Sequence, residues 1–155
     1  MEQPDGRMQP YALRAGEGWV YRFDVDFVVK AGEVRKGSGA AFLAYVTRQG
    51  EEPPGHTHKS EDEMFYVLEG AITFHCGEMA FDLEQGGFVF LPHGIEHSYT
   101  IRSPDPVRLI VVTAPVREGA SGGWGGFVSD LELGQGELVA EPPSVCETGD
   151  DRCKG

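Results

Sequence analysis

The chain has 155 residues, of which 13 are lysine or arginine and 25 are aspartate or glutamate, so its formal net charge is −12. This length allows one domain with its own hydrophobic core. The acidic balance argues against nucleic acid and anionic membranes as partners. No apolar run reaches the roughly 18 residues of a membrane span. Residues 1–11 lack the apolar core of a signal peptide, which predicts a cytoplasmic protein.

An arm of residues 1–15 precedes a series of short strands. Apolar, β-branched and aromatic runs bounded by glycine- and proline-containing turns are typical of such strands. We expect them at residues 19–23, 27–30, 40–47, 64–68, 72–76, 78–83, 88–91, 97–101 and 108–114. A short helix or turn is expected at 127–131, and the acidic residues 134–155 are expected to form a flexible tail. Many short strands at near-regular spacing predict one all-β domain, residues 16–133, of the jelly-roll type.

Three histidines and one glutamate form a candidate metal site. His56 and His58 are two residues apart, so on a strand both side chains point to the same face. Glu63 begins the next apolar run, and an antiparallel hairpin can bring His97 beside the first three residues. Three imidazoles and one carboxylate suit Fe, Mn, Co, Ni, Cu or Zn better than Ca or Mg. The sequence therefore predicts one divalent transition metal, of unknown identity, held by these four residues.

Strand alternation also predicts the wall of a substrate pocket. Inward residues on these strands share parity with Glu63 or with His97. The predicted pocket residues are Phe65, Val67, Tyr99 and Ile101. Such an apolar wall suits a flat organic molecule that offers one or two donor atoms to the metal. The other face of the strand at 64–68 is apolar too, which predicts a second layer or a homodimer interface.

The spacing of these residues resembles the two sequence motifs of the cupin superfamily. The first match runs Gly50-x5-His56-x-His58-x4-Glu63-x6-Gly70, and the second runs Gly86-x5-Pro92-x-Gly94-x2-His97. Ile101 stands where the second motif usually ends in Asn, which is not a metal ligand. The resemblance implies a cupin jelly-roll β-barrel with an N-terminal arm and a C-terminal tail. The motif pair occurs once, which implies a single barrel.

Beyond the motifs, segments within about residues 15–133 resemble small bacterial quercetinase-like cupins. These segments are 19–23, 27–32, 37–42, 53–58, 61–70, 114–115 and 126–127. The resemblance implies a metal-dependent dioxygenase that acts on a phenolic or enolic aromatic substrate with O2, as in the ring opening of a flavonol with loss of carbon monoxide. Four protein ligands on an octahedral ion leave two positions open. Glu63, the only anionic ligand, is the predicted catalytic base.

Other functions remain open for the same residues. A polyketide cyclase, an isomerase or a lyase could use the same metal site, and a non-catalytic cupin could simply bind a small molecule. The four polar residues could also line a barrel mouth without any metal. Fold alone does not decide between these functions.

Several residues near the motifs have simpler interpretations. His75 and His93 are expected at the surface, and Glu61 and Asp62 are expected to be solvated. Trp124 is flanked by glycines and is either a lid over the pocket or an anchor for a loose loop.

The chain contains three cysteines, too few for a disulfide framework. Cys76 shares strand parity with Phe74 and is expected in the core. Cys146 and Cys153 lie in the polar tail and could pair with each other, although a cytosolic location favours free thiols.

Overall fold

The computed structural model describes residues 11–32, 39–116, 123–130 and 136–142. The elements are β1 (Trp19–Arg22), β2 (Asp26–Ala31), β3 (Ala41–Thr47), β4 (Glu61–Glu69), β5 (Ile72–Cys76), β6 (Met79–Leu83), β7 (Phe88–Leu91), β8 (His97–Ile101), β9 (Val107–Pro115), α1 (Gly123–Asp130) and β10 (Glu137–Ala140). Each of the nine strand ranges expected above is present, with its ends shifted by three residues or fewer. No helix within the described ranges has the length and apolar character needed to span a membrane.

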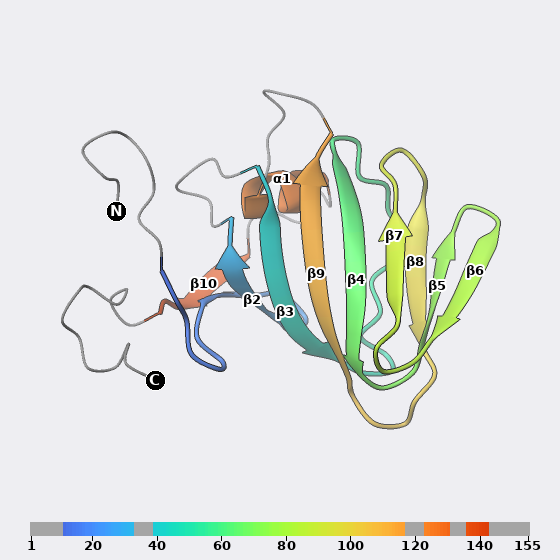
Figure 1. Cartoon of the computed structure of the whole chain (residues 1–155), viewed down its shortest axis with the longest axis horizontal. Coiled ribbons are helices and arrows are strands. Elements are labelled where there is room, and N and C mark those ends of the chain that lie inside the picture. Colours follow the sequence, from blue (N-terminus) through green and yellow to red (C-terminus); the bar gives the residue numbers. More distant parts are fainter. Residues whose placement is uncertain (1–10, 33–38, 117–122, 131–135, 143–155) are drawn as a thin grey trace.

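Two antiparallel sheets form the domain (Figure 1). The larger sheet has the strand order β10-β1-β2-β3-β9-β4-β7, and the smaller has the order β6-β5-β8. The sheets pack face to face, since the ring centroid of Phe65 on β4 lies 4.8 Å from that of Phe74 on β5. The predicted all-β jelly-roll fold is confirmed, and its strands pair as two sheets rather than as one closed cylinder.

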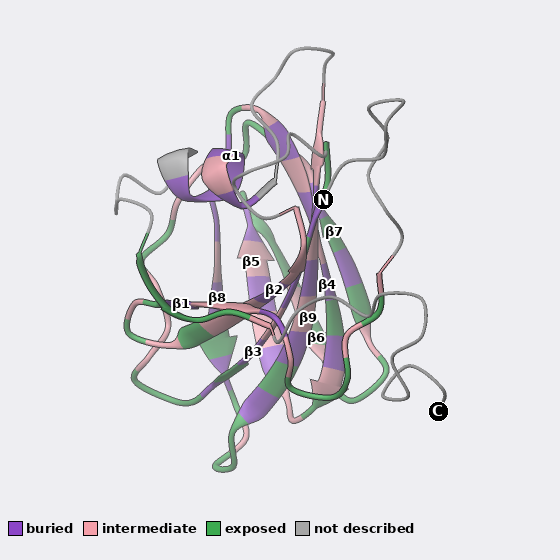
Figure 2. Cartoon of the chain, turned by 90° about the vertical axis from the view of Figure 1, so that its left-hand side faces the viewer, coloured by how far each residue is buried: buried purple, intermediate pink, exposed green. Residues whose placement is uncertain are grey.

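Alternating burial along the strands explains why this sequence forms two packed sheets. Successive side chains on a strand point to opposite faces, so every second residue can enter the core. On β3 and β9 the buried residues are Ala41, Leu43, Tyr45, Thr47, Val107, Leu109, Val111 and Thr113. Figure 2 shows the same banding of buried and exposed residues along β7. Each fully buried Leu or Val stabilises the fold by about 1.5–3 kcal/mol.

Two glycines of the two sequence motifs adopt backbone conformations that other residues rarely tolerate. Gly70 directly follows β4 with a φ of 96°, and a Cβ there would lie 2.7 Å from a methyl carbon of Val107. Gly94 has a φ of 80° in the turn before β8, and its backbone N–H donates to the carbonyl of His58 at 2.8 Å. This hydrogen bond joins the second motif to the first.

The C-terminal segment contains a strand that the sequence did not predict. β10 pairs antiparallel with β1, with Tyr21 opposite Leu138. The expectation of a flexible tail from residue 134 is therefore wrong for Glu137–Ala140. The edge of β1 offers unpaired backbone groups, which can bind another strand whatever its side chains. Cys146 and Cys153 lie outside the described residues.

Trp124 anchors helix α1 to the larger sheet. Its side chain is fully buried. Its ring stacks on that of Tyr21 at a centroid distance of 4.9 Å and on that of Phe127 at 5.6 Å. Its backbone N–H donates to the carbonyl of Gly32 at 2.8 Å. Of the two interpretations of Trp124, the structure supports the anchor.

Candidate metal centre

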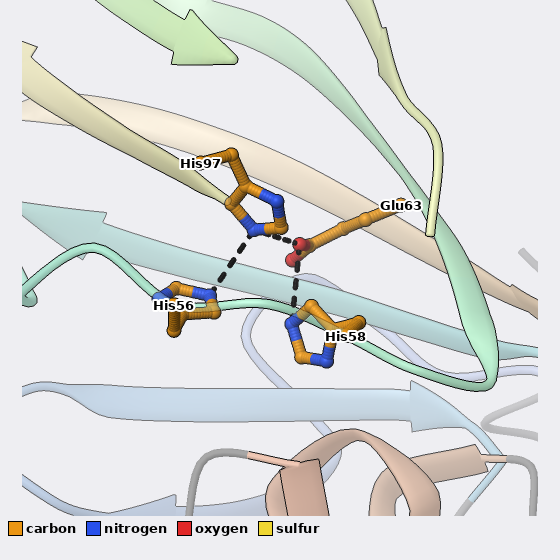
Figure 3. Close-up of side chains that lie close together, drawn as sticks. All are labelled: His56, His58, Glu63 and His97. Carbon is orange, nitrogen blue, oxygen red and sulfur yellow. Dashed lines mark hydrogen bonds and ion pairs between the residues drawn. The ribbon is translucent and has the colours of Figure 1, made fainter. Parts of the chain in front are cut away.

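Four side chains from three parts of the chain converge between the sheets (Figure 3). Glu63 comes from β4, His97 begins β8, and His56 and His58 come from the segment that leads into β4. Their potential ligand atoms all lie within 4.8 Å of one another. The structure therefore brings together all four of the metal ligands predicted from the sequence.

The segment with His56 and His58 is not a regular strand, in contrast to the sequence expectation. It forms one isolated antiparallel bridge, in which His56 and His97 exchange backbone N–H···O hydrogen bonds of 3.0 and 2.9 Å. The preceding Pro53 and Pro54 have no N–H to donate, so they cannot extend this pairing. The single bridge is nevertheless enough to fix His56 beside His97.

The distances within the cluster are those expected around one metal ion. The Nε2 atom of His97 lies 2.9 Å from Oε2 of Glu63 and 3.1 Å from Nε2 of His56. Nε2 of His58 lies 3.4 Å from the same Glu63 oxygen. Ligands at about 2.1 Å from an ion are roughly 3.0–3.4 Å apart in octahedral or tetrahedral geometry. The residues present therefore fit a transition metal that binds nitrogen and oxygen.

The protonation states of two ligands also suit a metal. Burial lowers the pKa of His56. Its Nδ1 lies 3.1 Å from the carbonyl of Pro54, which can only accept, so Nδ1 carries the proton and Nε2 faces the cluster. Burial acts to raise the pKa of Glu63, but hydrogen bonds from His58 and His97 outweigh it and lower that pKa to about 2. Glu63 is thus a carboxylate at neutral pH.

A cavity of about 230 Å³ opens onto His56 and Glu63. Six aromatic side chains line it: Phe23, Phe27, Tyr45, Phe65, Tyr99 and Phe127. Of the four predicted pocket residues, Phe65 and Tyr99 belong to this wall. Val67 and Ile101 are buried but are not part of it. Strand alternation correctly predicted that both side chains point to the inner face. They lie further along β4 and β8, however, and do not line the cavity.

Tyr45 and Phe127 are cavity residues that the sequence analysis missed. The hydroxyl of Tyr45 donates to that of Tyr99 at 3.3 Å. The ring of Phe127 stacks on His58 at a centroid distance of 5.1 Å. The alternating pattern of β3 places Tyr45 on the inner face and could have revealed it. Phe127 reaches the site from α1, and no strand pattern carries that information.

Of the polar residues near the ligands, His93 is exposed as expected and Glu61 is not in its expected environment. Glu61 was expected to be solvated, but it is buried on the inner face of β4, two residues before Glu63. The strand begins earlier than expected, and its alternation carries Glu61 inward. The partly exposed Asp62 accepts hydrogen bonds from the backbone N–H and the ring Nδ1 of His93, at 2.9 and 2.8 Å. This contact holds the turn before Gly94 against β4.

Substitution Ile101→Asn is expected to destabilise the fold rather than to alter ligand binding directly. Ile101 is buried opposite Ile72 and does not reach the cavity. An unpaired amide there costs about 1–3 kcal/mol, in addition to the lost apolar burial. Chemical denaturation should show the loss of stability. Weaker binding of an aromatic ligand at unchanged stability would place Ile101 at the cavity after all.

Comparisons with known proteins agree with this fold. The model of the cupin domain family matches residues 45–113. No curated protein sequence matches the chain.

Three solved structures illustrate the likeness. A predicted oxalate decarboxylase from Thermotoga maritima is 19% identical, with a TM-score of 0.60 over 68% of this chain and 99% of that one. KdgF from a Halomonas species is 17% identical, with a TM-score of 0.57 over 72% and 97%. The cupin domain of Schizosaccharomyces pombe Cnp3 is 21% identical, with a TM-score of 0.54 over 61% and 67%. At these identities the likeness shows the fold alone, and the family match identifies a cupin domain within residues 45–113 of the chain.

Proposed function

We propose that the protein is a metal-dependent dioxygenase of the quercetinase-like type, acting on a phenolic or enolic aromatic substrate. The observation that carries this proposal is the position of three imidazoles and one carboxylate at the end of an aromatic cavity. A divalent ion held by His56, His58, Glu63 and His97 would supply two open coordination positions and a positive charge that acidifies a phenol or enol.

Glu63 is the residue best placed to take the proton of the substrate hydroxyl. It is buried, ionised and in contact with the cavity. As a carboxylate, Glu63 can accept this proton and pass it on. In this role Glu63 moves the proton and thereby leaves the electron-rich enolate that reacts with O2.

The residues of the cavity wall would orient the substrate. Its aromatic rings offer flat apolar faces and keep water away from the reacting atoms. The hydroxyl groups of Tyr45 and Tyr99 are both buried, and burial raises the pKa of each, so both stay protonated at neutral pH. Because Tyr45 donates its proton to Tyr99, the hydroxyl of Tyr99 is the one available to donate a hydrogen bond to a second oxygen of the substrate.

Oxygen uptake by the metal-loaded protein tests the proposal. Flavonols, catechols and enolic diketones are the compounds to screen, with the metal-free protein as the control. One O2 consumed and one carbon monoxide released per flavonol would support the quercetinase-like reaction. Aromatic ligands that bind without O2 consumption would favour a cyclase, an isomerase, a lyase or a binding protein. If no aromatic compound binds, the phenolic substrate class is wrong.

We also propose that two copies of the chain associate through the outer face of the larger sheet. Tyr66, Phe88 and Phe90 are exposed there, with Tyr66 opposite Phe88 and the partly buried Met64 opposite Phe90. Few charged side chains interrupt these two rows, so two acidic chains can approach at this face. The same face on both copies would meet in a twofold contact.

The double variant with Tyr66→Lys and Phe90→Lys is expected to be monomeric at concentrations where the wild type is a dimer. Two buried, unpaired ammonium groups per chain would have to be desolvated in the contact. Sedimentation velocity measures the change. Met79→Lys is the control, because Met79 is exposed on the smaller sheet and should leave the dimer intact. A monomeric wild type would contradict the proposal.

A further inference from the structure

The acidic residues around the cavity indicate which substrate charge the site accepts. This inference rests on the function proposed above. Besides Glu63, three carboxylates line the cavity: Asp24, Glu51 and Glu52. No lysine or arginine is among the described residues that line it. We propose that these three carboxylates make the cavity select uncharged aromatic substrates and reject aromatic carboxylates and dicarboxylates.

Glu52 is the best fixed of the three carboxylates. Its Oε1 accepts the backbone N–H of Ile101 at 3.2 Å, and its Oε2 accepts the N–H of Gly50 at 2.7 Å. Burial acts to raise the pKa of Glu52, but these backbone hydrogen bonds outweigh it and lower that pKa. Glu52 therefore holds a full negative charge in a fixed position at the cavity wall.

The other two carboxylates differ in how far they are neutralised. Glu51 accepts the backbone N–H of Arg48 at 3.0 Å, and its second oxygen lies 3.8 Å from the guanidinium of Arg48. That guanidinium is largely exposed, so it offsets little of the charge. Asp24 is exposed at the cavity mouth. The cavity entrance is thus negative in a chain that is already acidic.

A bound carboxylate normally requires a cationic partner, most often arginine. The basic side chains Lys30, Arg48 and Arg108 do not line the cavity but an adjoining groove, which shares Asp24 and Glu51 with it, so Glu52 is the one of the three carboxylates that faces the cavity alone. Within the cavity, the neutral hydroxyl that can donate to a ligand is that of Tyr99, since Tyr45 donates its proton to Tyr99. A metal could hold one anionic oxygen of a ligand, but a second anionic group would meet carboxylates without a counter-charge.

A matched pair of ligands tests this selectivity by binding alone. The two ligands 3,4-dihydroxybenzamide and 3,4-dihydroxybenzoate offer the same two hydroxyls and a similar shape, and differ in one negative charge. The full-length protein, loaded with the metal that it carries when purified, is titrated with each ligand and followed by absorbance and calorimetry. We expect the amide to bind at least about tenfold more tightly than the carboxylate.

Charge-removing variants identify the residues responsible. Glu52→Gln should reduce the preference for the amide about threefold, and the triple variant with Asp24→Asn, Glu51→Gln and Glu52→Gln should nearly abolish it. Glu78→Gln removes one equal charge from an exposed turn outside the cavity, so it should leave the preference unchanged.

Two outcomes would overturn this inference alone. One is equal affinity of the wild type for the two ligands, and the other is a preference that the triple variant changes no more than Glu78→Gln does. If neither ligand binds the metal-loaded wild type, the proposed phenolic substrate class is wrong, and this inference falls with it.

Discussion

Trp124→Ala is expected to lower the free energy of unfolding by about 3–5 kcal/mol, the usual cost of removing a large buried aromatic side chain. Trp124 is fully buried and packs on Tyr21, Phe27 and Phe127. The cavity left behind would lie between α1 and the larger sheet. Because Phe127 stacks on His58, the substitution should also loosen the metal site.

Equilibrium denaturation in urea measures this effect, with Met79→Ala as the control. Met79 is 62% exposed, and its truncation should change stability by less than about 0.5 kcal/mol. If Trp124→Ala were as stable as the wild type, α1 would not be anchored to the sheet by this residue, and its position over the site would need another cause.

Glu63→Gln is expected to reduce turnover by roughly 10²-fold or more, the usual scale for a lost general base. Glutamine keeps the shape and one oxygen ligand, but it removes the negative charge and most of the basicity. Some metal should therefore remain bound. Steady-state oxygen uptake, normalised to the metal content of each sample, separates the two effects.

Tyr45→Phe is a useful companion variant, because it removes a cavity hydroxyl but no metal ligand. It should weaken substrate binding more than it slows turnover at saturation. Unchanged turnover in metal-loaded Glu63→Gln would contradict the role of Glu63 as a base and leave it only as a metal ligand.

The strands and the four side chains of the candidate metal site were predictable because both depend on short-range patterns. A continuous apolar run indicated β4, alternation indicated β8, and the spacing from His56 to His97 specified which side chains meet. Glycines with positive φ, such as Gly70 and Gly94, then fix the turns that this spacing requires. These signals are local, so the sequence alone reveals them.

Other features depend on how far a residue lies from the site and on contacts between distant segments. Short sequence patterns do not reveal either. Parity places Val67 and Ile101 on the inner face, but how far each lies from the metal site depends on how the sheets pack. β10 is exposed along its whole length, without the buried alternation of the core strands, and it forms by pairing with the edge of β1. Glu52 reaches the cavity through a hydrogen bond to β8, from a loop without any periodic pattern.

Elemental analysis of protein purified without chelators is the most direct test of the metal site. The wild type should contain about one divalent transition metal ion per chain, and His58→Ala should lose most of it. The four ligands act together, so His56→Ala and His97→Ala should lose metal as well. A wild type that contains no metal and takes up none, or full retention of metal in all three histidine variants, would contradict the assignment.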